Sequence, residues 1–444
     1  MHTQLSLWEL DATPLRRASS LRDQLELKYA PLLQERPELA ESVSYKANKE
    51  IPLLRLYRYK EAFAYTLVKD VLCTHQSSAR ATVLDPFCGM GTTLLTSAIT
   101  GVPAWGVDRL PVGVFVANTL LKMLELEPGS IRDAYDQLAE RVAHLPEAEV
   151  ADDVAIMKVA FEPPVLRRLR QWKTGILGLP SPQQEVMTLL LLSILESCSY
   201  TSKDGQFLRL RRDRKPLFPD EALLERVCAA ERDLRQIRSL GWKQRAQAVA
   251  ILGDARSLPA SPFQAKPNLI VTSPPYANRY DYTRSYSLEL CFFFVKNFED
   301  LKHLRQSILR SHIEVKVGSD EESSHPVVQE VVALLRARRE QLNNPRIPDM
   351  ITGYFVDMER VIHELARVAA DDAVIYMVVD NVRFEGELLP VDLILCDIAE
   401  QSGFQTDAVW VARYKGNSSQ QMGRYGRVPV RESVLVWRKS DAQK

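Results

Sequence analysis

Apolar residues recur with two different periods along the chain, and the change of period marks the predicted elements. Short apolar runs at residues 81–84 and 104–107 flank a longer run at 92–99, which Gly101 ends. A strand, a helix and a second strand in this order form a βαβ unit, so we expect a parallel sheet. Another helix is expected to begin at Tyr57, before the first strand.

Between residues 128 and 246 the pattern becomes helical. Four helices are predicted there, over residues 130–143, 162–172, 182–197 and 219–240. The third has the signals of a helix start, with Ser181 as N-cap, Pro182 at the first position and Gln184 completing a capping box. This stretch is therefore predicted to be a helical insertion between the second and third strands.

Strands and helices alternate again after residue 247. Strands are predicted over residues 248–252, 268–271, 373–379, 408–413 and 433–438, and helices over 354–370 and 389–401. The last two strands, joined by a polar and glycine-bearing loop, predict a terminal β-hairpin. We therefore expect an α/β protein with a Rossmann-like sheet, a helical insertion and a hairpin at its end.

These patterns divide the chain into four parts. We expect an N-terminal helical extension over residues 1–44, one α/β domain formed by 45–127 and 247–444, and the insertion over 128–246. Within the last part, residues from about 297 to 349 are expected to be irregular. They include an acidic and serine-rich stretch at 319–324 that predicts an exposed loop.

Composition and charge narrow the function only a little. The 444 residues include 57 basic and 57 acidic side chains, so the formal net charge is zero. This excludes a protein coated in positive charge but leaves room for a local patch that binds nucleic acid. The six cysteines are scattered without a C-x-x-C pair, which favours reduced thiols and no metal site. No leader peptide or membrane-length apolar run is evident, so we expect a cytoplasmic protein without a membrane partner.

The turn after the first predicted strand has the sequence Asp85-Pro-Phe-Cys-Gly-Met-Gly-Thr92. It lies at the carboxyl end of a parallel strand, where open α/β sheets bind ligands. Gly89 and Gly91 let the backbone approach a ligand closely. The turn lacks the third glycine of a dinucleotide motif and the Lys-Ser/Thr of a phosphate loop, which disfavours a nicotinamide dehydrogenase. It therefore suits a cofactor without phosphates.

Acidic residues end three consecutive strands of the predicted sheet. They are Asp85, Asp108 and Asp254. Carboxylates at this edge of an α/β sheet can accept hydrogen bonds from a bound ligand. Each one alone is as well explained by a helix cap, but three in this order, together with the glycine turn, predict a cofactor site.

Two motifs together resemble those of the DNA amino-methyltransferases, which make N4-methylcytosine or N6-methyladenine. Residues 85–93 are similar to the cofactor motif of that family, and Thr272-Ser-Pro-Pro-Tyr276 is similar to its catalytic motif. Tyr59-Lys-Glu-Ala-Phe63 resembles the helix that closes over the methionine end of the cofactor. The resemblance covers residues 45–121 and 247–439, and it does not extend to the helical insertion.

The resemblance implies S-adenosylmethionine as the cofactor and the seven-stranded sheet of the methyltransferases that use it. It also implies that Asp85 meets the cofactor's ammonium, Asp108 the ribose hydroxyls and Asp254 the adenine amino group. The further cofactor-binding residues that we expect are Pro86, Phe87, Cys88, Gly89, Gly91, Thr92, Thr93, Lys60 and Phe63.

The catalytic motif has the groups that methylation of an amine needs. The lone pair of an exocyclic amine is delocalised into the base, and acceptors on its hydrogens favour attack on the sulfonium methyl and stabilise the developing charge. The Ser273 oxygen and the Pro274 carbonyl are the expected acceptors. Pro275 helps to fix that carbonyl, and Tyr276 offers a flat face for the base. Enzymes of this kind act on a base flipped out of the duplex.

Ser273 also bears on the identity of the base. Members that methylate N4 of cytosine commonly have Ser before Pro-Pro, whereas those that methylate N6 of adenine commonly have Asp or Asn, so Ser273 favours cytosine. Residues 415–424 also resemble a segment of the N4-cytosine members. N6 of adenine stays open as the alternative.

Residues expected to contact DNA fall in two basic segments. After the catalytic motif, Arg279 and Arg284 are expected to reach phosphates, and Tyr280 or Tyr282 to fill the space left by the flipped base. In the insertion, residues 203–215 form the densest basic run and are expected to be a loop presented to phosphate. The candidates in this run are Arg209, Arg211 and Arg212.

The expected partner is double-stranded DNA, and a cognate restriction endonuclease acting separately is a candidate second partner. An RNA guanine-N2 methyltransferase is the closest alternative, but such enzymes usually carry Asp or Asn before Pro-Pro-Tyr and an N-terminal RNA-binding domain. A catalytically silent DNA-binding module is the alternative from another class, and the intact residues 273–276 argue against it. Residues 302–346 compete with 203–215 as the segment that reads the DNA sequence.

Overall fold

In the computed structural model, the described residues are 20–75, 81–204, 207–314, 318, 323–416, 426 and 429–440. Two predictions fall largely outside them. Residues 319–322 of the expected acidic loop and residues 417–424 of the segment similar to N4-cytosine members lie outside the described residues.

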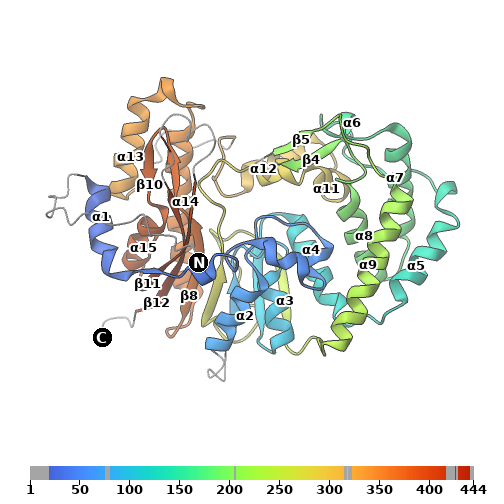
Figure 1. The fold of residues 1–444 in the computed structure, drawn as a ribbon, viewed down its shortest axis with the longest axis horizontal. Coiled ribbons are helices and arrows are strands. Elements are labelled where there is room, and N and C mark those ends of the chain that lie inside the picture. The colour runs from blue at the N-terminus through green and yellow to red at the C-terminus, as the bar shows by residue number, and fades with distance from the viewer. Residues whose placement is uncertain are drawn as a thin grey trace, which may run out of the picture.

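Eight strands form one central sheet (Figure 1). They are β1 (Leu33–Glu35), β2 (Val83–Asp85), β3 (Ala104–Asp108), β6 (Ala248–Leu252), β7 (Leu269–Thr272), β8 (Val374–Asp380), β11 (Phe404–Lys415) and β12 (Val430–Lys439). Their order is β1-β11-β12-β8-β7-β2-β3-β6, and β12 runs antiparallel to both of its neighbours. The predicted Rossmann-like sheet with a terminal hairpin is confirmed, and β1 adds an eighth strand at the edge.

Helices cover both faces of this sheet, because alternate residues of each strand face opposite sides. Val83 and Val271 face one apolar core, and Leu84 and Ile270 face the other. The first core includes α2 (Tyr65–Thr74), α3 (Thr92–Thr100) and α4 (Pro111–Met123). The second includes α1 (Leu21–Tyr29), α13 (Pro326–Ala337), α14 (Ile347–Val368) and α15 (Val391–Gln401). Figure 1 shows the second set of helices on the left and the first set to the right of the sheet.

The insertion between β3 and β6 extends the first core to the far right of Figure 1. Its elements are α5 (Ser130–Ala139), α6 (Met157–Ala160), α7 (Pro163–Leu177), α8 (Gln183–Ile194), β4 (Thr201–Asp204), β5 (Phe207–Leu210) and α9 (Pro219–Ser239). The buried Trp172 stacks on Tyr135 with ring centroids 5.1 Å apart, which packs α7 against α5. The four predicted helices are present, and the antiparallel hairpin β4–β5 is an addition to them.

Two helix starts differ from the prediction. The helix expected from Tyr57 begins only at Tyr65. Tyr57 and Tyr59 are buried while Arg58 between them is exposed, an alternation that extended backbone provides and a helix does not. The capping box at 181–184 is also wrong, because Pro182 is the N-cap of α8 and the Ser181 hydroxyl donates to Glu185 instead, at 2.9 Å.

Two segments are more regular than the prediction had them. The part from about 297 to 349 contains α12 (Phe298–Ser307) and α13, whose apolar side chains pack into the two cores. The basic run at 203–215 is not a simple loop, because its first half belongs to the β4–β5 hairpin. Short elements fill the stretches after β7 and β8: α10 (Tyr282–Ser285), α11 (Ser287–Glu289), a π-helix (Leu290–Phe294), β9 (Val382–Phe384) and β10 (Glu387–Leu389).

The two sequence motifs leave the sheet at neighbouring positions. From β2 the chain builds outward through β3 to β6, and it then returns to place β7 on the other side of β2. This reversal is the topological switch point at which open α/β sheets bind ligands. The cofactor turn follows β2 and the catalytic motif follows β7, so the fold brings them together there.

The close packing of β3 under the cofactor turn can be tested at Gly106. A Cβ at this position would lie 2.5 Å from the Cys88 Cβ and 3.1 Å from the Asp85 carbonyl oxygen. We expect Gly106→Ala to lower the free energy of unfolding by ~1–3 kcal/mol, as overpacking of cores does, measured by chemical denaturation. Gly178→Ala is the control, because its nearest neighbour would be 3.5 Å away. Equal stability of the two variants would contradict this account of the packing.

Candidate active site

Asp85 is buried between the two motifs, with 1% of its surface exposed. One carboxylate oxygen accepts hydrogen bonds from the Thr272 hydroxyl at 2.8 Å and the Phe87 amide at 3.1 Å. The other accepts from the Thr93 hydroxyl at 2.7 Å. Burial raises the pKa of Asp85 to about 7 although these donors favour the charged form. The carboxylate therefore ties the end of the catalytic strand to the cofactor turn.

Asp108 holds the glycine turn from the next strand end. Its two oxygens accept from the Gly89 and Leu110 amides, each at 2.8 Å. Gly89 and Gly91 have φ angles of 48° and 85°, the left-handed region that favours glycine. Burial raises the pKa of the Asp108 carboxyl. A carboxylate has about four lone-pair sites, so Asp108 retains acceptor capacity for a ligand.

A cavity with about 500 Å³ of empty space lies against this turn, and we call it the cofactor cavity. Its walls include the rings of Tyr59, Phe87 and Tyr282 and the carboxylates of Glu61 and Asp108. Aromatic faces beside two carboxylates suit a ligand with a flat ring, hydroxyl groups and positive charge.

The cofactor cavity fits S-adenosylmethionine, which has an adenine ring, ribose hydroxyls and a sulfonium cation. Thr92 Oγ1 is buried at the base of the turn and has no hydrogen-bond partner among the described residues. A Cβ on Gly89 would lie 2.9 Å from the Tyr59 ring, so this turn and this ring leave no space for a side chain between them. The groups present therefore agree with the cofactor expected from the sequence.

The predicted cofactor residues divide by their place relative to this cavity. Phe87 and Asp108 line it. Asp85 is 1% exposed and does not line it, so its contact with the cofactor's ammonium stays a prediction. The residues that build the turn beneath the cavity are Pro86, Cys88, Gly89, Gly91, Thr92 and Thr93.

Three predicted cofactor residues point elsewhere. Asp254 forms an ion pair with Arg256 at 2.7 Å and is not in the wall of the cofactor cavity. Phe63 is 5% exposed and packs in the first apolar core. Lys60 Nζ donates to the backbone carbonyl of Lys203. The extended backbone of residues 57–64 turns Tyr59 and Glu61 towards the cavity in place of Lys60 and Phe63.

A second cavity, with about 870 Å³ of empty space, lies on the other side of the catalytic motif, and we call it the catalytic cavity. Pro274 and Tyr276 line it, whereas Pro275 lines the cofactor cavity. Ser273, Glu61 and Tyr282 line both. The catalytic motif is thus part of the wall that the two cavities share.

The hydroxyl of Ser273 has a defined direction. Its oxygen lies 3.1 Å from the Val378 carbonyl of β8, to which it donates its hydrogen. A hydroxyl has one hydrogen and two acceptor lone pairs. With the hydrogen engaged by Val378, Ser273 faces the cavities as an acceptor.

Charged residues of the C-terminal hairpin form the polar wall of the catalytic cavity. Glu432 is 2% exposed and accepts hydrogen bonds from Arg413, Lys415 and the Tyr276 hydroxyl. Lys415 Nζ also lies 3.2 Å from Asp380, whose pKa burial raises to about 7. The same ammonium is 5.6 Å from the centroid of the Tyr276 ring. The flat face predicted for the base is therefore bordered by cationic donors.

The residues predicted to contact DNA after the catalytic motif have separate environments. Tyr280 lines the catalytic cavity, is 9% exposed and packs edge-on against Tyr282 at 4.9 Å. Arg284 pairs with Glu314 at 2.7 Å and with Asp281 at 3.5 Å. Arg279 has a positive φ of 71° and lines a neighbouring cavity instead. Of the four residues predicted there, Tyr280 and Tyr282 thus line the catalytic cavity, whereas Arg279 and Arg284 do not.

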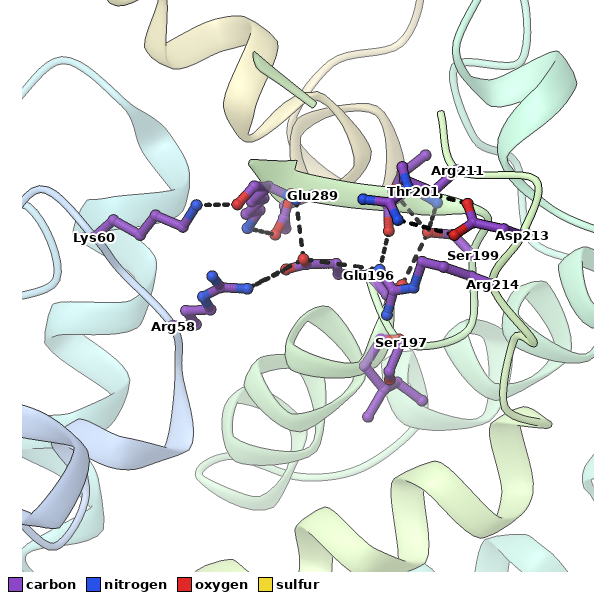
Figure 2. Close-up of polar contacts among 12 residues, drawn as sticks. Arg58, Lys60, Glu196, Ser197, Ser199, Thr201, Arg211, Asp213, Arg214 and Glu289 are labelled. Atoms are coloured by element: carbon purple, nitrogen blue, oxygen red, sulfur yellow. Dashed lines mark hydrogen bonds and ion pairs between the residues drawn. The ribbon is translucent and has the colours of Figure 1, made fainter. Parts of the chain in front are cut away.

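The arginines predicted in the insertion lie on and after the β4–β5 hairpin. Arg209, Arg211 and Arg212 are all exposed. Arg211 pairs with Asp213 at 2.8 Å (Figure 2), and the Arg212 guanidinium lies 5.4 Å from the centroid of the Tyr200 ring. Their contact with phosphate stays a prediction.

Sequence reasoning missed several residues of both cavities. Tyr57 and Tyr59 alternate with Arg58 and Lys60, and this alternation was the signal for extended backbone there. Glu432 is an acidic residue at the start of the apolar run 433–437, and an acidic residue within a buried strand is a signal of a polar site. Lys415 carries no comparable signal, because its contacts are made across the sheet.

Three further observations concern metal ligands, apolar helices and cysteines. In the described part of the chain, no group of three or more His, Cys, Asp or Glu side chains is placed to hold a metal ion. None of the described helices is long and apolar enough to cross a bilayer. The six cysteines are all free thiols.

Comparison with known proteins identifies the family. No protein-family model matches the chain. The rRNA methyltransferase AviRa from Streptomyces viridochromogenes, a solved structure, matches at 12% identity over 85% of this chain and 86% of its own, with a TM-score of 0.32, an overlap too weak to bear on fold or function.

Curated relatives match far better. The type II methyltransferase M.AvaI from Nostoc sp. is 34% identical over 430 residues, which cover 89% of this chain and 88% of the relative. The type II methyltransferase M.BsoBI from Geobacillus stearothermophilus is 31% identical over 473 residues, which cover 94% of this chain and 92% of the relative. With both motifs side by side at the switch point of the sheet, the chain belongs to the type II methyltransferases.

Proposed function

We propose that this protein transfers a methyl group from S-adenosylmethionine to the exocyclic amine of a flipped DNA base, N4 of cytosine. The observation that carries the proposal is the position of Ser273, which lies in the wall of both the cofactor cavity and the catalytic cavity. Glu61 and Tyr282 share this position, so these three residues border the path of a methyl group from one cavity to the other. The sulfonium of the bound cofactor supplies the electrophilic methyl.

The residues at the junction favour attack by an amine. Ser273 donates its hydrogen to Val378, so its lone pairs are free to accept a hydrogen of the amine. The Pro274 carbonyl is the second acceptor, and the two prolines limit its movement. Acceptors on both amine hydrogens draw the nitrogen out of conjugation and stabilise the positive charge that develops on it.

The wall of the catalytic cavity supports a pyrimidine in particular. Tyr276 presents a ring on which a base can stack. Lys415 binds Asp380 and Glu432, and an ammonium has a third hydrogen to donate. Cytosine has a carbonyl oxygen, O2, on the edge that carries N4, whereas adenine has only a C–H group at the matching position. A cationic donor beside the base therefore agrees with Ser273 in favouring cytosine.

Double-stranded DNA is the proposed substrate, and the cytoplasm the proposed place of action. The relatives are type II methyltransferases, and the catalytic cavity, with the Tyr276 ring in its wall, suits a base removed from its stack. Arg209, Arg211 and Arg212 are exposed on a hairpin and are proposed to contact phosphates. A restriction endonuclease that cleaves the same unmodified site is the proposed separate partner.

The base can be identified directly. Modification-sensitive sequencing of DNA from cells that express the protein is expected to show N4-methylcytosine at one short sequence. Cells that express Ser273→Ala are the control and should lack the mark. N6-methyladenine at one site would replace cytosine by adenine in the proposal. The proposal would be overturned if the purified protein methylated tRNA and left DNA unmodified.

Loss of the Asp85 carboxylate should disable the cofactor site. Asp85→Ala leaves the Thr272 and Thr93 hydroxyls and the Phe87 amide without their acceptor. We expect the Kd for S-adenosylmethionine to rise by about 100-fold or more, since unpaired buried donors cost ~1–3 kcal/mol each. Calorimetric titration measures the Kd, and a value within a factor of two of wild type would contradict the role assigned to Asp85.

Loss of the Ser273 hydroxyl should affect turnover and spare the cofactor. We expect Ser273→Ala to lower kcat by roughly 100-fold or more, the effect of removing one group that stabilises a transition state. The Kd for the cofactor should stay within about twofold, because the turn and Asp108 are untouched. Single-turnover methylation and calorimetry give the two values. Equal losses in both would show that Ser273 holds the cofactor cavity together rather than acting on the amine.

A further inference from the structure

Residues 58–61 form a wall shared by the cofactor cavity and the β4–β5 hairpin. Side chains alternate in this extended segment, as they do in strands. Tyr59 and Glu61 line the cofactor cavity. Arg58 pairs with Glu196 at 3.2 Å, and Lys60 donates to the backbone carbonyl of Lys203 in β4 (Figure 2).

Lys203 of β4 is the residue at which these contacts converge. Its amide donates to Glu196 at 2.9 Å, and its carbonyl accepts from Lys60. Its side chain is 5% exposed and forms an ion pair with the buried Glu289. The ammonium lies 4.3 Å from the ring centroid of Tyr286 and 5.6 Å from that of Tyr57. A cation enclosed in this way by two rings and a carboxylate is held in one position.

Tyr286 connects Lys203 to the wall of the cofactor cavity. Its ring stacks on Tyr59 with centroids 5.0 Å apart and planes 18° apart. Its hydroxyl donates to Glu61 at 2.5 Å. One ring therefore contacts the ammonium of Lys203 and both residues that residues 58–61 contribute to the cofactor cavity.

The other strand of the hairpin carries the exposed basic residues. In the ladder, Lys203 pairs with Leu208, and Arg209 pairs with Ser202. Arg211 and Arg212 follow directly. A change in the position of β5 at these arginines also changes the position of Lys203 in β4, because the two strands are hydrogen-bonded along their length.

We propose that Lys203 is a positioning residue that couples duplex binding at the hairpin to cofactor binding in the cavity. This proposal rests on the proposed function, which has double-stranded DNA as the substrate. A duplex bound by Arg209, Arg211 and Arg212 fixes the hairpin, and Lys203 then fixes Tyr286, Tyr59 and Glu61 in the arrangement that the cofactor needs. By linkage, the bound cofactor strengthens duplex binding by the same factor.

The test compares cofactor affinity with and without DNA. Lys203→Met alone would leave Glu289 as an unpaired buried charge, so the test variant is Lys203→Met with Glu289→Gln, which keeps the cluster neutral. Sinefungin, an unreactive cofactor analogue, is titrated calorimetrically into the protein alone and into the protein saturated with DNA. This DNA is an unmodified duplex that contains the sequence found to be methylated in cells. We expect the duplex to lower the Kd of sinefungin by about 5- to 150-fold in the wild-type protein and by less than about twofold in the variant.

A matched control separates coupling from general loss of stability. Arg55→Met with Asp233→Asn removes another ion pair between the N-terminal segment and the insertion, away from the hairpin. In this control variant, the duplex should lower the Kd of sinefungin by the same factor as in the wild-type protein. The coupling would be overturned if the duplex left the Kd of sinefungin unchanged in the wild-type protein. It would also be overturned if the duplex lowered this Kd as much in the Lys203 variant as in the wild-type protein. Either result would leave the proposed function intact. Failure of the wild-type protein to bind the duplex at all would overturn both.

Discussion

The buried carboxylate of Asp85 is the contact on which the site depends. The pairing of β2 with β7 stops at Leu84 and Ile270, before either motif begins. Beyond that point Asp85 continues the connection, because it binds Thr272 at the end of β7 and Thr93 in the first turn of α3. Desolvation opposes the charge, and hydrogen bonds from three donors offset part of that cost. The junction of the two cavities is held by this one side chain.

Segments outside the parallel part of the sheet complete both cavities. The C-terminal hairpin supplies Arg413, Lys415 and Glu432 to the catalytic cavity. The extended segment before α2 supplies Tyr59 and Glu61 to the cofactor cavity. The sheet thus fixes where the reaction takes place, whereas the polar and aromatic surroundings come from parts of the chain that are distant in sequence.

This division explains which features the sequence could predict. Asp85, Asp108 and Ser273 follow apolar strands directly, so local patterns place them at one sheet edge. The alternation at Tyr57 and Tyr59 indicates extended backbone, but no local pattern assigns Tyr59 or Lys415 to a cavity, because both reach it through contacts across the fold. The helix expected at Tyr57 fails for the same reason, because tertiary packing of alternate side chains overrides helix propensity there. Asp254 was placed at the correct strand end, but its neighbour Arg256 occupies the carboxylate.

If the target is N4 of cytosine, as proposed, the hydrogen bond from Ser273 to the Val378 carbonyl also selects against other bases. It leaves only lone pairs of the serine oxygen towards the catalytic cavity. Thymine and uracil carry a carbonyl oxygen where cytosine carries its amine, so this oxygen and Ser273 would face each other as two acceptors. Sites built to accept hydrogens reject analogues that lack them, because the buried groups are left unpaired. On the proposed function, the orientation of one hydroxyl would therefore disfavour uracil, the deamination product of cytosine, without any steric barrier.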